Sequence, residues 1–253
     1  GKLYKATSEN LLEKVILNEI NQNIDSRVID KNGFWIPITY RSRVLAYNPK
    51  KVDVNELSNY EDLINEKRKN RILVRTSTNA YNQALLSSIV AHHGEEFALD
   101  WSNKIVTNFA RNPKGNDRDQ IRAIVAGIGD VAIVNSYYVG LLKSSEDSLD
   151  RKVGESVKVF FPNQKDRGAH INISGMGLLK NAPNKENAKK FMEFYLNPEN
   201  PALNTEQQLN ISANGPSRAM LSDDLKSNPF INPPAEVYNS LQIFEDLGGD
   251  IIR

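Results

Sequence analysis

Three tyrosines stand where two predicted strands give way to helices. Tyr137 and Tyr138 directly follow a buried strand predicted for residues 130–135, and Tyr81 follows a shorter strand predicted for 71–75. Ligands of open α/β sheets bind beyond the carboxyl ends of the strands, so the three phenols could converge on one cleft. A phenol with a pKa of about 10 binds metal at neutral pH only if the metal displaces its proton. Fe(III), a hard trivalent cation that prefers oxygen donors, can do this.

The ordinary interpretation of these tyrosines stays open on the residues alone. Tyrosine is common at helix starts and on half-buried surfaces, where its hydroxyl bonds water. Nothing in the spacing of Tyr81, Tyr137 and Tyr138 excludes that interpretation.

A rival metal site is the stretch from His92 to Glu96, which holds two histidines and two carboxylates in five residues. Adjacent histidines on a helix point in different directions, whereas a helical zinc site needs histidines four residues apart. Gly94 is typical of a helix C-cap. A solvated helix end, with the histidines near the negative end of the dipole, is therefore favoured over a zinc site.

Motifs of catalysis are missing from the sequence. There is no phosphate-binding Gly-x-x-x-x-Gly-Lys loop and no Gly-x-Ser-x-Gly elbow, and Gly127-Ile128-Gly129 precedes a strand instead of following one. Surface solvation is a sufficient explanation for Asp117, Asp119 and Asp130. His170 is either a hydrogen-bonded core histidine or a hinge residue. No catalytic motif therefore supports an enzyme, and we expect none; a hydrolase or transferase using His92 and Glu95 is the weaker alternative.

Composition agrees with a soluble globular protein: 40% of the 253 residues are hydrophobic and 25% are charged. The net charge of +1, from 32 basic and 31 acidic residues, argues against a nucleic-acid binder. The absence of cysteine excludes disulfides and thiolate metal sites. No apolar run approaches the ~18 residues of a membrane-spanning helix.

Strand and helix patterns alternate along the chain. The stretch 34–47 predicts one long strand or two collinear strands, and 170–174 predicts another. Helices are predicted for 82–91 and for 117–126, the second with Asn116 as its N-cap. A helical pattern also covers the opening through Leu11, Leu12, Val15 and Ile16, and another helix runs to Leu196. This alternation favours an α/β fold with a mostly parallel sheet.

The run from Gly168 to Ala188 resembles the signature of the periplasmic ferric-iron-binding proteins, which are substrate-binding components of iron ABC transporters. Asn135-Ser136-Tyr137-Tyr138 resembles the paired tyrosine ligands of that family, and Tyr81 matches its third tyrosine ligand. In the cyanobacterial-type branch an arginine at the position of Arg41 lies near the metal. The resemblance covers nearly the whole chain.

The resemblance implies the fold of a type II periplasmic binding protein, with two lobes joined by hinge strands. Lobe 1 would comprise 1–43 and 168–253, and lobe 2 would comprise 44–167. The implied function is extracytoplasmic binding of Fe(III) by a periplasmic, monomeric protein that passes iron to an ABC transporter permease. A protein of the same fold that carries a small organic anion, dependent above all on Arg41, is the alternative.

Three departures from the family pattern are visible. Family members begin with a strand and a His-Tyr or similar pair that supplies a further ligand, so we expect this chain to be amino-terminally incomplete; it also shows no signal segment. Leu141 stands where some relatives carry arginine. The loop from Asn210 to Pro216 differs from the usual tyrosine-proline loop, so the anion or water that completes the coordination sphere is left open.

Overall fold

The computed structural model describes residues 2–15, 30–196 and 211–212. Its contacts divide the chain into unit 1, Gly1–Arg41 with Asn172–Ile231, and unit 2, Ser42–Ile171 with Asn232–Arg253. Among the described residues, the chain therefore passes from one unit to the other inside strand β2, Trp35–Tyr47, and at the start of strand β6, Ile171–Leu179. The lobe boundaries expected at 43/44 and 167/168 stay a prediction, and the expectations for Ile16 and for most of the 210–216 loop lie outside the described residues.

Unit 1 contains short strands that pair with the two long ones. Strand β1 is antiparallel to β6, with Leu12 opposite Leu179, and β7 is antiparallel to β2, with Thr39 opposite Ser212. In the strand order β6 lies next to β2. The remaining bounds in this unit are α1, Lys2–Ser8; β1, Leu12–Glu13; α6, Lys185–Leu196; and β7, Ile211–Ser212.

The opening helix is shorter than its pattern predicted. Helix α1 ends at Ser8, and Asn10 adopts a φ of +58°, a left-handed conformation that asparagine tolerates and that commonly stops a helix. Leu12 then pairs as a strand residue. The apolar spacing beyond Ser8 therefore belongs to a strand, and the helix prediction there was wrong.

Glycine allows close packing within unit 1. A Cβ atom at Gly175 of β6 would lie 2.5 Å from the carbonyl oxygen of Ile36 and 3.0 Å from the Trp35 ring. The predicted strand at 170–174 is confirmed but longer, because Gly175 continues it alongside these residues.

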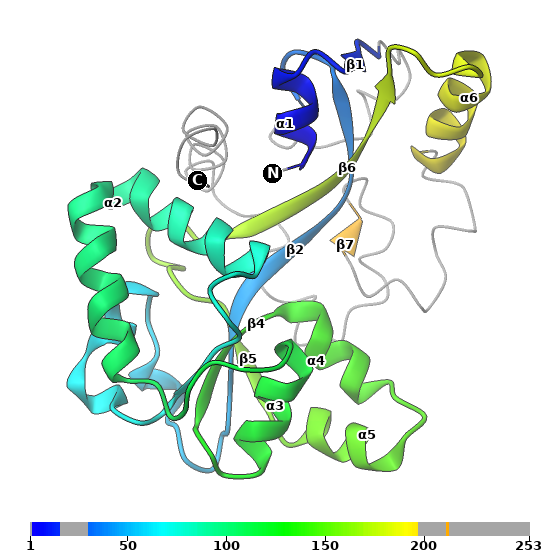
Figure 1. The fold of residues 1–253 in the computed structure, drawn as a ribbon. Helices are drawn as coiled ribbons and strands as arrows, with labels where there is room; N and C mark the ends of the chain where they lie inside the picture. Colours follow the sequence, from blue (N-terminus) through cyan, green and yellow to red (C-terminus); the bar gives the residue numbers. More distant parts are fainter. Residues whose placement is uncertain (1, 16–29, 197–210, 213–253) are drawn as a thin grey trace. The chain divides into compact units, whose positions relative to one another are not determined.

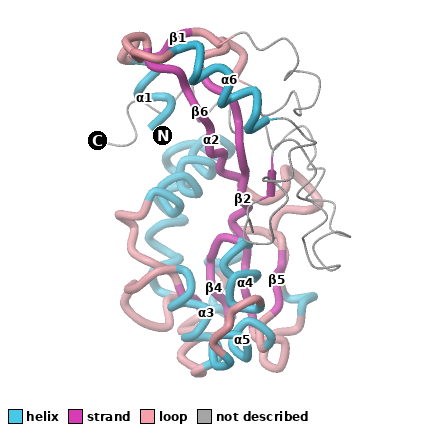
Figure 2. Tube along the Cα trace, turned by 90° about the vertical axis from the view of Figure 1, so that its right-hand side faces the viewer, coloured by secondary structure: helices cyan, strands magenta, loops and turns pink. Residues whose placement is uncertain are grey.

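Unit 2 is built on a four-stranded part of the sheet in the order β5–β2–β4–β3. Strand β4 is antiparallel to β2 and parallel to β3, and β5 is antiparallel to β2. Figures 1 and 2 show helices α3, α4 and α5 gathered beside these strands. The bounds are β3, Ile72–Leu73; α2, Ala80–Thr107; α3, Asp117–Val125; β4, Val131–Asn135; α4, Ser136–Lys143; α5, Ser148–Glu155; β5, Lys158–Phe160; and 3₁₀ turns at Val54–Glu56, Glu61–Ile64 and Glu66–Arg68.

The expectation of a mostly parallel sheet was wrong for the described strands. Of the five strand pairs with a recorded direction, β3 and β4, which α2 and α3 connect, are parallel and the other four pairs are antiparallel. The long strand β2 runs against both β4 and β5. Strand β2 pairs with residues far along the chain, such as Arg43 with Asn135, so its local sequence carries no signal for the direction of that pairing.

The core of unit 2 forms around β4, whose five residues are all buried. Val44 and Leu45 of β2 and Ile121 and Ile124 of α3 are fully buried as well. Helix α3 begins where predicted, because Asn116 and Asp119 form a capping box at its start. This packing holds the carboxyl end of β4, and therefore the first turn of α4, in a fixed place.

Helix α2 is longer than its sequence pattern predicted and contains a kink. Gly94 has φ +81° and ψ 169°, so it breaks the helix as expected of a C-cap glycine, but a second helical segment resumes directly after it. Among the described residues, no helix combines the length and apolarity needed to cross a bilayer.

Candidate metal centre

The three tyrosines each lie in the first turn of a helix that follows a strand of unit 2. Tyr81 is the second residue of α2, where the Asn79 side chain caps the helix by accepting a hydrogen bond from the Tyr81 amide at 3.0 Å. Tyr137 and Tyr138 are the second and third residues of α4, directly after the buried strand β4. All three side chains are half-buried.

The structure brings these three phenols together. The rings of Tyr137 and Tyr138 have centroids 4.1 Å apart at an interplanar angle of 33°. The Tyr137 hydroxyl shares hydrogen bonds with those of Tyr138 and Tyr81. Burial raises the pKa of Tyr137, and these hydrogen bonds to its neighbours raise it further. Without metal, the cluster therefore keeps the Tyr137 proton at neutral pH.

A buried ion pair lies beside the tyrosines. The Nη1 atom of Arg43 is 2.6 Å from Oδ2 of Asp117, and both side chains are completely buried. Arg43 also donates hydrogen bonds to Asn135 at 3.1 Å and to Asn82 at 2.6 Å. Arg43 therefore connects β2 to the end of β4 and to the first turn of α2. A buried arginine needs several such acceptors to offset the loss of hydration.

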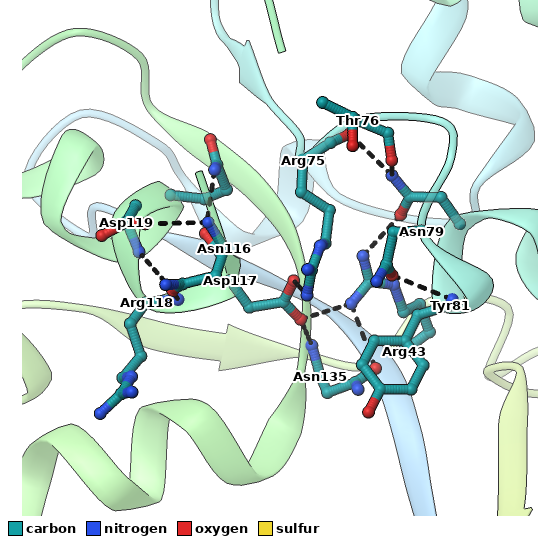
Figure 3. A network of polar contacts seen from close by, with 12 residues as sticks. Arg43, Arg75, Thr76, Asn79, Tyr81, Asn116, Asp117, Arg118, Asp119 and Asn135 are labelled. Carbon is teal, nitrogen blue, oxygen red and sulfur yellow. Dashed lines mark hydrogen bonds and ion pairs between the residues drawn. The ribbon is translucent and has the colours of Figure 1, made fainter. Parts of the chain in front are cut away.

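Asp117 joins this network from the start of α3. Its carboxylate accepts hydrogen bonds from the backbone amide of Asn135 at 2.8 Å and from Nη1 of Arg75 at 3.3 Å, in addition to the bond from Arg43. Figure 3 shows the carboxylate between the two guanidinium groups, with the Tyr81 ring beside Arg43. The carboxylate thus fixes both arginines and the residue that precedes α4.

Two positive charges border the Tyr81 ring. The Cζ atoms of Arg43 and Arg75 lie 5.8 Å and 5.9 Å from its centroid, within the range of cation–π contact. Counting Asp117, the network contributes two positive charges and one negative charge, a net +1. This net positive charge favours the binding of anions, and it opposes a cation that arrives without negative ligands.

Comparison with known proteins identifies the family. The family model for bacterial extracellular solute-binding proteins matches residues 3–238. The chain is a member of this family. Its members bind solutes, which agrees with the expectation that this chain is not an enzyme.

Relatives of this solute-binding protein include iron proteins. It is 43% identical to Iron uptake protein A1 and 45% identical to Iron uptake protein A2, both from Synechocystis, and each alignment covers 77% of this chain but only 54% and 57% of the relative. The chain therefore spans about half the length of these curated relatives. The Fe(3+)-binding periplasmic protein of Serratia marcescens is 31% identical over 64% of this chain and 46% of its own length.

Solved structures place the fold in the type II periplasmic binding protein class. The Trichodesmium protein IdiA (FutA), in complex with iron and citrate, superposes with a TM-score of 0.81 at 38% identity over 98% of this chain and 80% of the other. Apo FutA2 from Synechocystis gives a TM-score of 0.82 at 36% identity over 100% and 80% of the two chains. The predicted α/β fold class is confirmed.

Arg41, the predicted arginine near the metal, belongs to unit 1. There its Nη1 atom donates a hydrogen bond to the Ser174 hydroxyl at 2.5 Å. Its role beside iron stays a prediction. Arg43 and Arg75, which flank Tyr81 in unit 2, were not predicted from the sequence as residues of the site.

The prediction that Asp117 is a solvated surface residue was wrong. The side chain is fully buried and paired with two arginines. One signal was available: Arg43 precedes the apolar run Val44-Leu45-Ala46, and an arginine inside a buried strand requires an acidic partner. The sequence does not say which acidic residue that partner is.

In the stretch from His92 to Glu96, His93 contacts a carboxylate from another part of the chain. His93 Nε2 lies 2.9 Å from Glu61 Oε1, and Arg167 pairs with the same carboxylate. Burial lowers the pKa of His92, and Arg167 and His93 lower it further. Among the described residues, no group of three or more His, Cys, Asp or Glu side chains is arranged to hold a metal ion.

His170 is a buried residue of unit 2 that lies two residues before unit 1 resumes at Asn172, so the hinge interpretation stays a prediction. It is 6% exposed; its amide donates to the Tyr60 hydroxyl at 3.1 Å, and its carbonyl accepts the Arg43 amide at 2.8 Å. The Tyr60 hydroxyl in turn donates to the Arg43 carbonyl at 2.5 Å. Burial raises the pKa of Tyr60, which therefore remains a neutral donor.

Proposed function

We propose that this solute-binding protein binds Fe(III) through the phenolate oxygens of Tyr81, Tyr137 and Tyr138. The observation that carries the proposal is the meeting of three phenols at the first turns of α2 and α4. The names of its relatives, which refer to iron uptake and Fe(3+) binding, point to the same metal.

The chemistry of the cluster suits a strongly polarising cation. Because the pKa of Tyr137 lies above its usual value, the metal must displace a firmly held proton. Hard Fe(III) gains most from oxygen donors, whereas softer divalent cations compete poorly for protonated phenols. The phenolate oxygens therefore favour Fe(III), while the raised pKa of Tyr137 adds the same proton-displacement cost for every cation.

The charges around the cluster are compatible with this proposal. Three phenolates would cancel the three positive charges of Fe(III), leaving the net +1 of Arg43, Arg75 and Asp117. That residual charge would favour an anionic ligand from solution in the remaining coordination positions. Arg41 would add a further positive charge, as the family resemblance implies.

The biological setting follows from the family. We propose that the whole protein works outside the cytoplasm, in the periplasm, as a monomer that passes iron to an ABC transporter permease. Relatives named as periplasmic iron-binding proteins support this setting.

A second candidate function is the binding of a small organic anion at the same place. The two guanidinium groups beside Tyr81 favour it, because their positive charge attracts an anion. The tyrosine hydroxyls would then donate hydrogen bonds to that anion. This alternative predicts binding that does not depend on iron.

A visible absorbance titration with nitrilotriacetate-bound Fe(III) tests the proposal. We expect a saturable tyrosinate-to-iron charge-transfer band that disappears in the Tyr137→Phe, Tyr138→Phe double variant. A Tyr195→Phe variant, changed on α6 in unit 1, is the matched control and keeps the band. Unchanged iron affinity in the folded double variant would contradict tyrosinate binding.

A further inference from the structure

A cavity of about 610 Å³ lies within unit 2. Its walls come from the segment after β3, from both halves of α2 and from the chain between α2 and α3. Binding sites for small molecules typically measure 300–1,000 Å³. The cavity therefore has room for a compact organic molecule.

One part of the cavity wall is apolar and aromatic. Leu85, Trp101, Ile105 and Phe109 line it. The indole N–H of Trp101 already donates to the Tyr60 carbonyl at 2.9 Å, so this residue offers a ligand its ring surface and no donor. Such a wall favours a flat or branched apolar body.

The cavity is also lined by two arginines. Arg75 and Arg111 both contribute to the wall, and neither Nη2 of Arg75 nor Nη1 of Arg111 makes a hydrogen bond within the described part of the chain. Their recorded side-chain bonds run to Asp117 and Gln120. The described lining residues include no aspartate or glutamate. The wall thus has two cationic groups with hydrogen-bonding capacity left over, and the carboxylate that pairs with Arg75, Asp117, is not itself a lining residue.

We infer that this cavity binds a small organic anion with an aromatic body and one carboxylate, for example an aryl alkanoate. The carboxylate would accept hydrogen bonds from Nη2 of Arg75 and Nη1 of Arg111, and charge-assisted bonds of this kind are stronger than neutral ones. The aromatic body would pack against Trp101 and Phe109. This site requires neither iron nor the phenol groups of the tyrosines.

Isothermal titration calorimetry of the metal-free protein with matched ligands tests the inference. The probe is 4-phenylbutyrate; 4-phenylbutanol keeps the body without the charge, and acetate keeps the charge without the body. We expect one molecule of 4-phenylbutyrate to bind at least about tenfold more tightly than 4-phenylbutanol or acetate, since a charged hydrogen bond contributes about that factor.

Two substitutions locate the binding. Arg111→Gln removes a charge that lies outside the tyrosine cluster and should weaken 4-phenylbutyrate about tenfold. Ile105→Trp should fill the apolar part and abolish binding. The exposed Arg118→Gln is the matched control and should leave the affinity unchanged.

Tryptophan emission gives a second, local readout. The chain has two tryptophans, Trp35 in unit 1 and Trp101 on the cavity wall. In a Trp35→Phe background, saturation with 4-phenylbutyrate should change the emission of Trp101.

Three outcomes would overturn the inference. They are the absence of 4-phenylbutyrate binding, equal affinity for 4-phenylbutyrate and 4-phenylbutanol, and full affinity in the Arg111→Gln variant. If Ile105→Trp does not fold by circular dichroism, Arg111→Gln and the Trp101 emission decide. The measurements use no iron, so a failure here is distinct from a failure of the proposed iron site.

Discussion

The Arg43–Asp117 pair links residues that no local pattern connects. Its members stand 74 positions apart, on β2 and at the start of α3, and both are completely buried. Through Asn135 and Asn82 the pair is also attached to the segments that carry Tyr137 and Tyr81. A buried pair contributes little net stability over apolar residues, but it becomes costly when only one partner is removed.

Replacing Asp117 with alanine should therefore destabilise the protein strongly. The substitution leaves the Arg43 guanidinium buried without its ionic partner and removes acceptors for Arg75 and for the Asn135 amide. We expect a loss of about 3–5 kcal/mol in the free energy of unfolding, measured by urea denaturation.

Asp100→Ala is the control for that measurement. Asp100 pairs with Lys104 on the surface of α2, and more than half of its side chain is exposed. Exposed pairs contribute about 0–1 kcal/mol. Equal losses for Asp117→Ala and Asp100→Ala would show that the buried pair has no special role.

The tyrosine cluster predicts a dependence of stability on alkaline pH. The pKa of Tyr137 is raised in the folded protein, by burial first and then by hydrogen bonds to Tyr138 and Tyr81. Above the usual tyrosine pKa of about 10, the unfolded chain loses this proton before the folded one does. The unfolded state then binds fewer protons, so the stability that is present below pH 10 declines as the pH rises.

Urea denaturation between pH 8 and 11 measures this effect. The wild-type free energy of unfolding should fall more steeply above pH 10 than that of Tyr137→Phe, which has no proton to lose at this position. Parallel slopes for the two proteins would mean that the cluster does not hold the Tyr137 proton.

The candidate site was only partly predictable from single residues. The positions of Tyr81, Tyr137 and Tyr138 followed from where strands end and helices begin, which is local information. Arg75 and Asp117 were missed because their burial depends on packing between β2, β3 and α3. The neighbouring residues in the sequence do not reveal that packing. The ligand role of the tyrosines remains a prediction.

At the level of elements, both halves of α2 contribute to the cavity, and the first half also carries a candidate metal ligand. The half before Gly94 carries Tyr81 and supplies Leu85 to the cavity wall, and the half after it supplies Trp101 and Ile105. At Gly94, φ +81° and ψ 169° belong to a region that is almost exclusive to glycine. The glycine therefore sets the angle between the two halves.

Gly94→Ala should destabilise the protein by about 1–3 kcal/mol because alanine is strained in this conformation. No atom lies within 4 Å of the added Cβ, so the expected cost comes from the backbone alone. Thermal unfolding beside Glu95→Ala, an exposed neighbour, measures it. An alanine variant as stable as the Glu95 variant would show that the kink is not fixed by the backbone of Gly94.

Local signals predicted some elements better than others. The capping residues of α3 and the apolar run of β4 gave both elements nearly at their observed bounds. The second half of α2 was missed because a C-cap glycine signals a helix end but not the new helix that starts after it. Strand direction failed because pairing of β2 with β4 depends on residues about 90 positions apart, such as Arg43 and Asn135.

At the scale of the whole molecule, iron binding should appear as stability. A ligand that binds only the folded state stabilises it by about 2.7 kcal/mol when its concentration is 100 times the dissociation constant. For a protein of roughly this size each kcal/mol raises the midpoint of thermal unfolding by about 2–4 °C. Saturating Fe(III) should therefore raise that midpoint by roughly 5–10 °C in differential scanning calorimetry.

The variants connect this global shift to the site that causes it. Because the phenolates would be the ligands, the Tyr137→Phe, Tyr138→Phe protein should show no iron-dependent shift, while Tyr195→Phe should show the full shift. Adding 4-phenylbutyrate to the iron-free protein should raise the midpoint in the double variant as well, since the cavity lies outside the changed phenols. An iron-dependent shift of equal size in the double variant would place the metal elsewhere on the molecule and leave the tyrosine cluster as an ordinary hydrogen-bonded group.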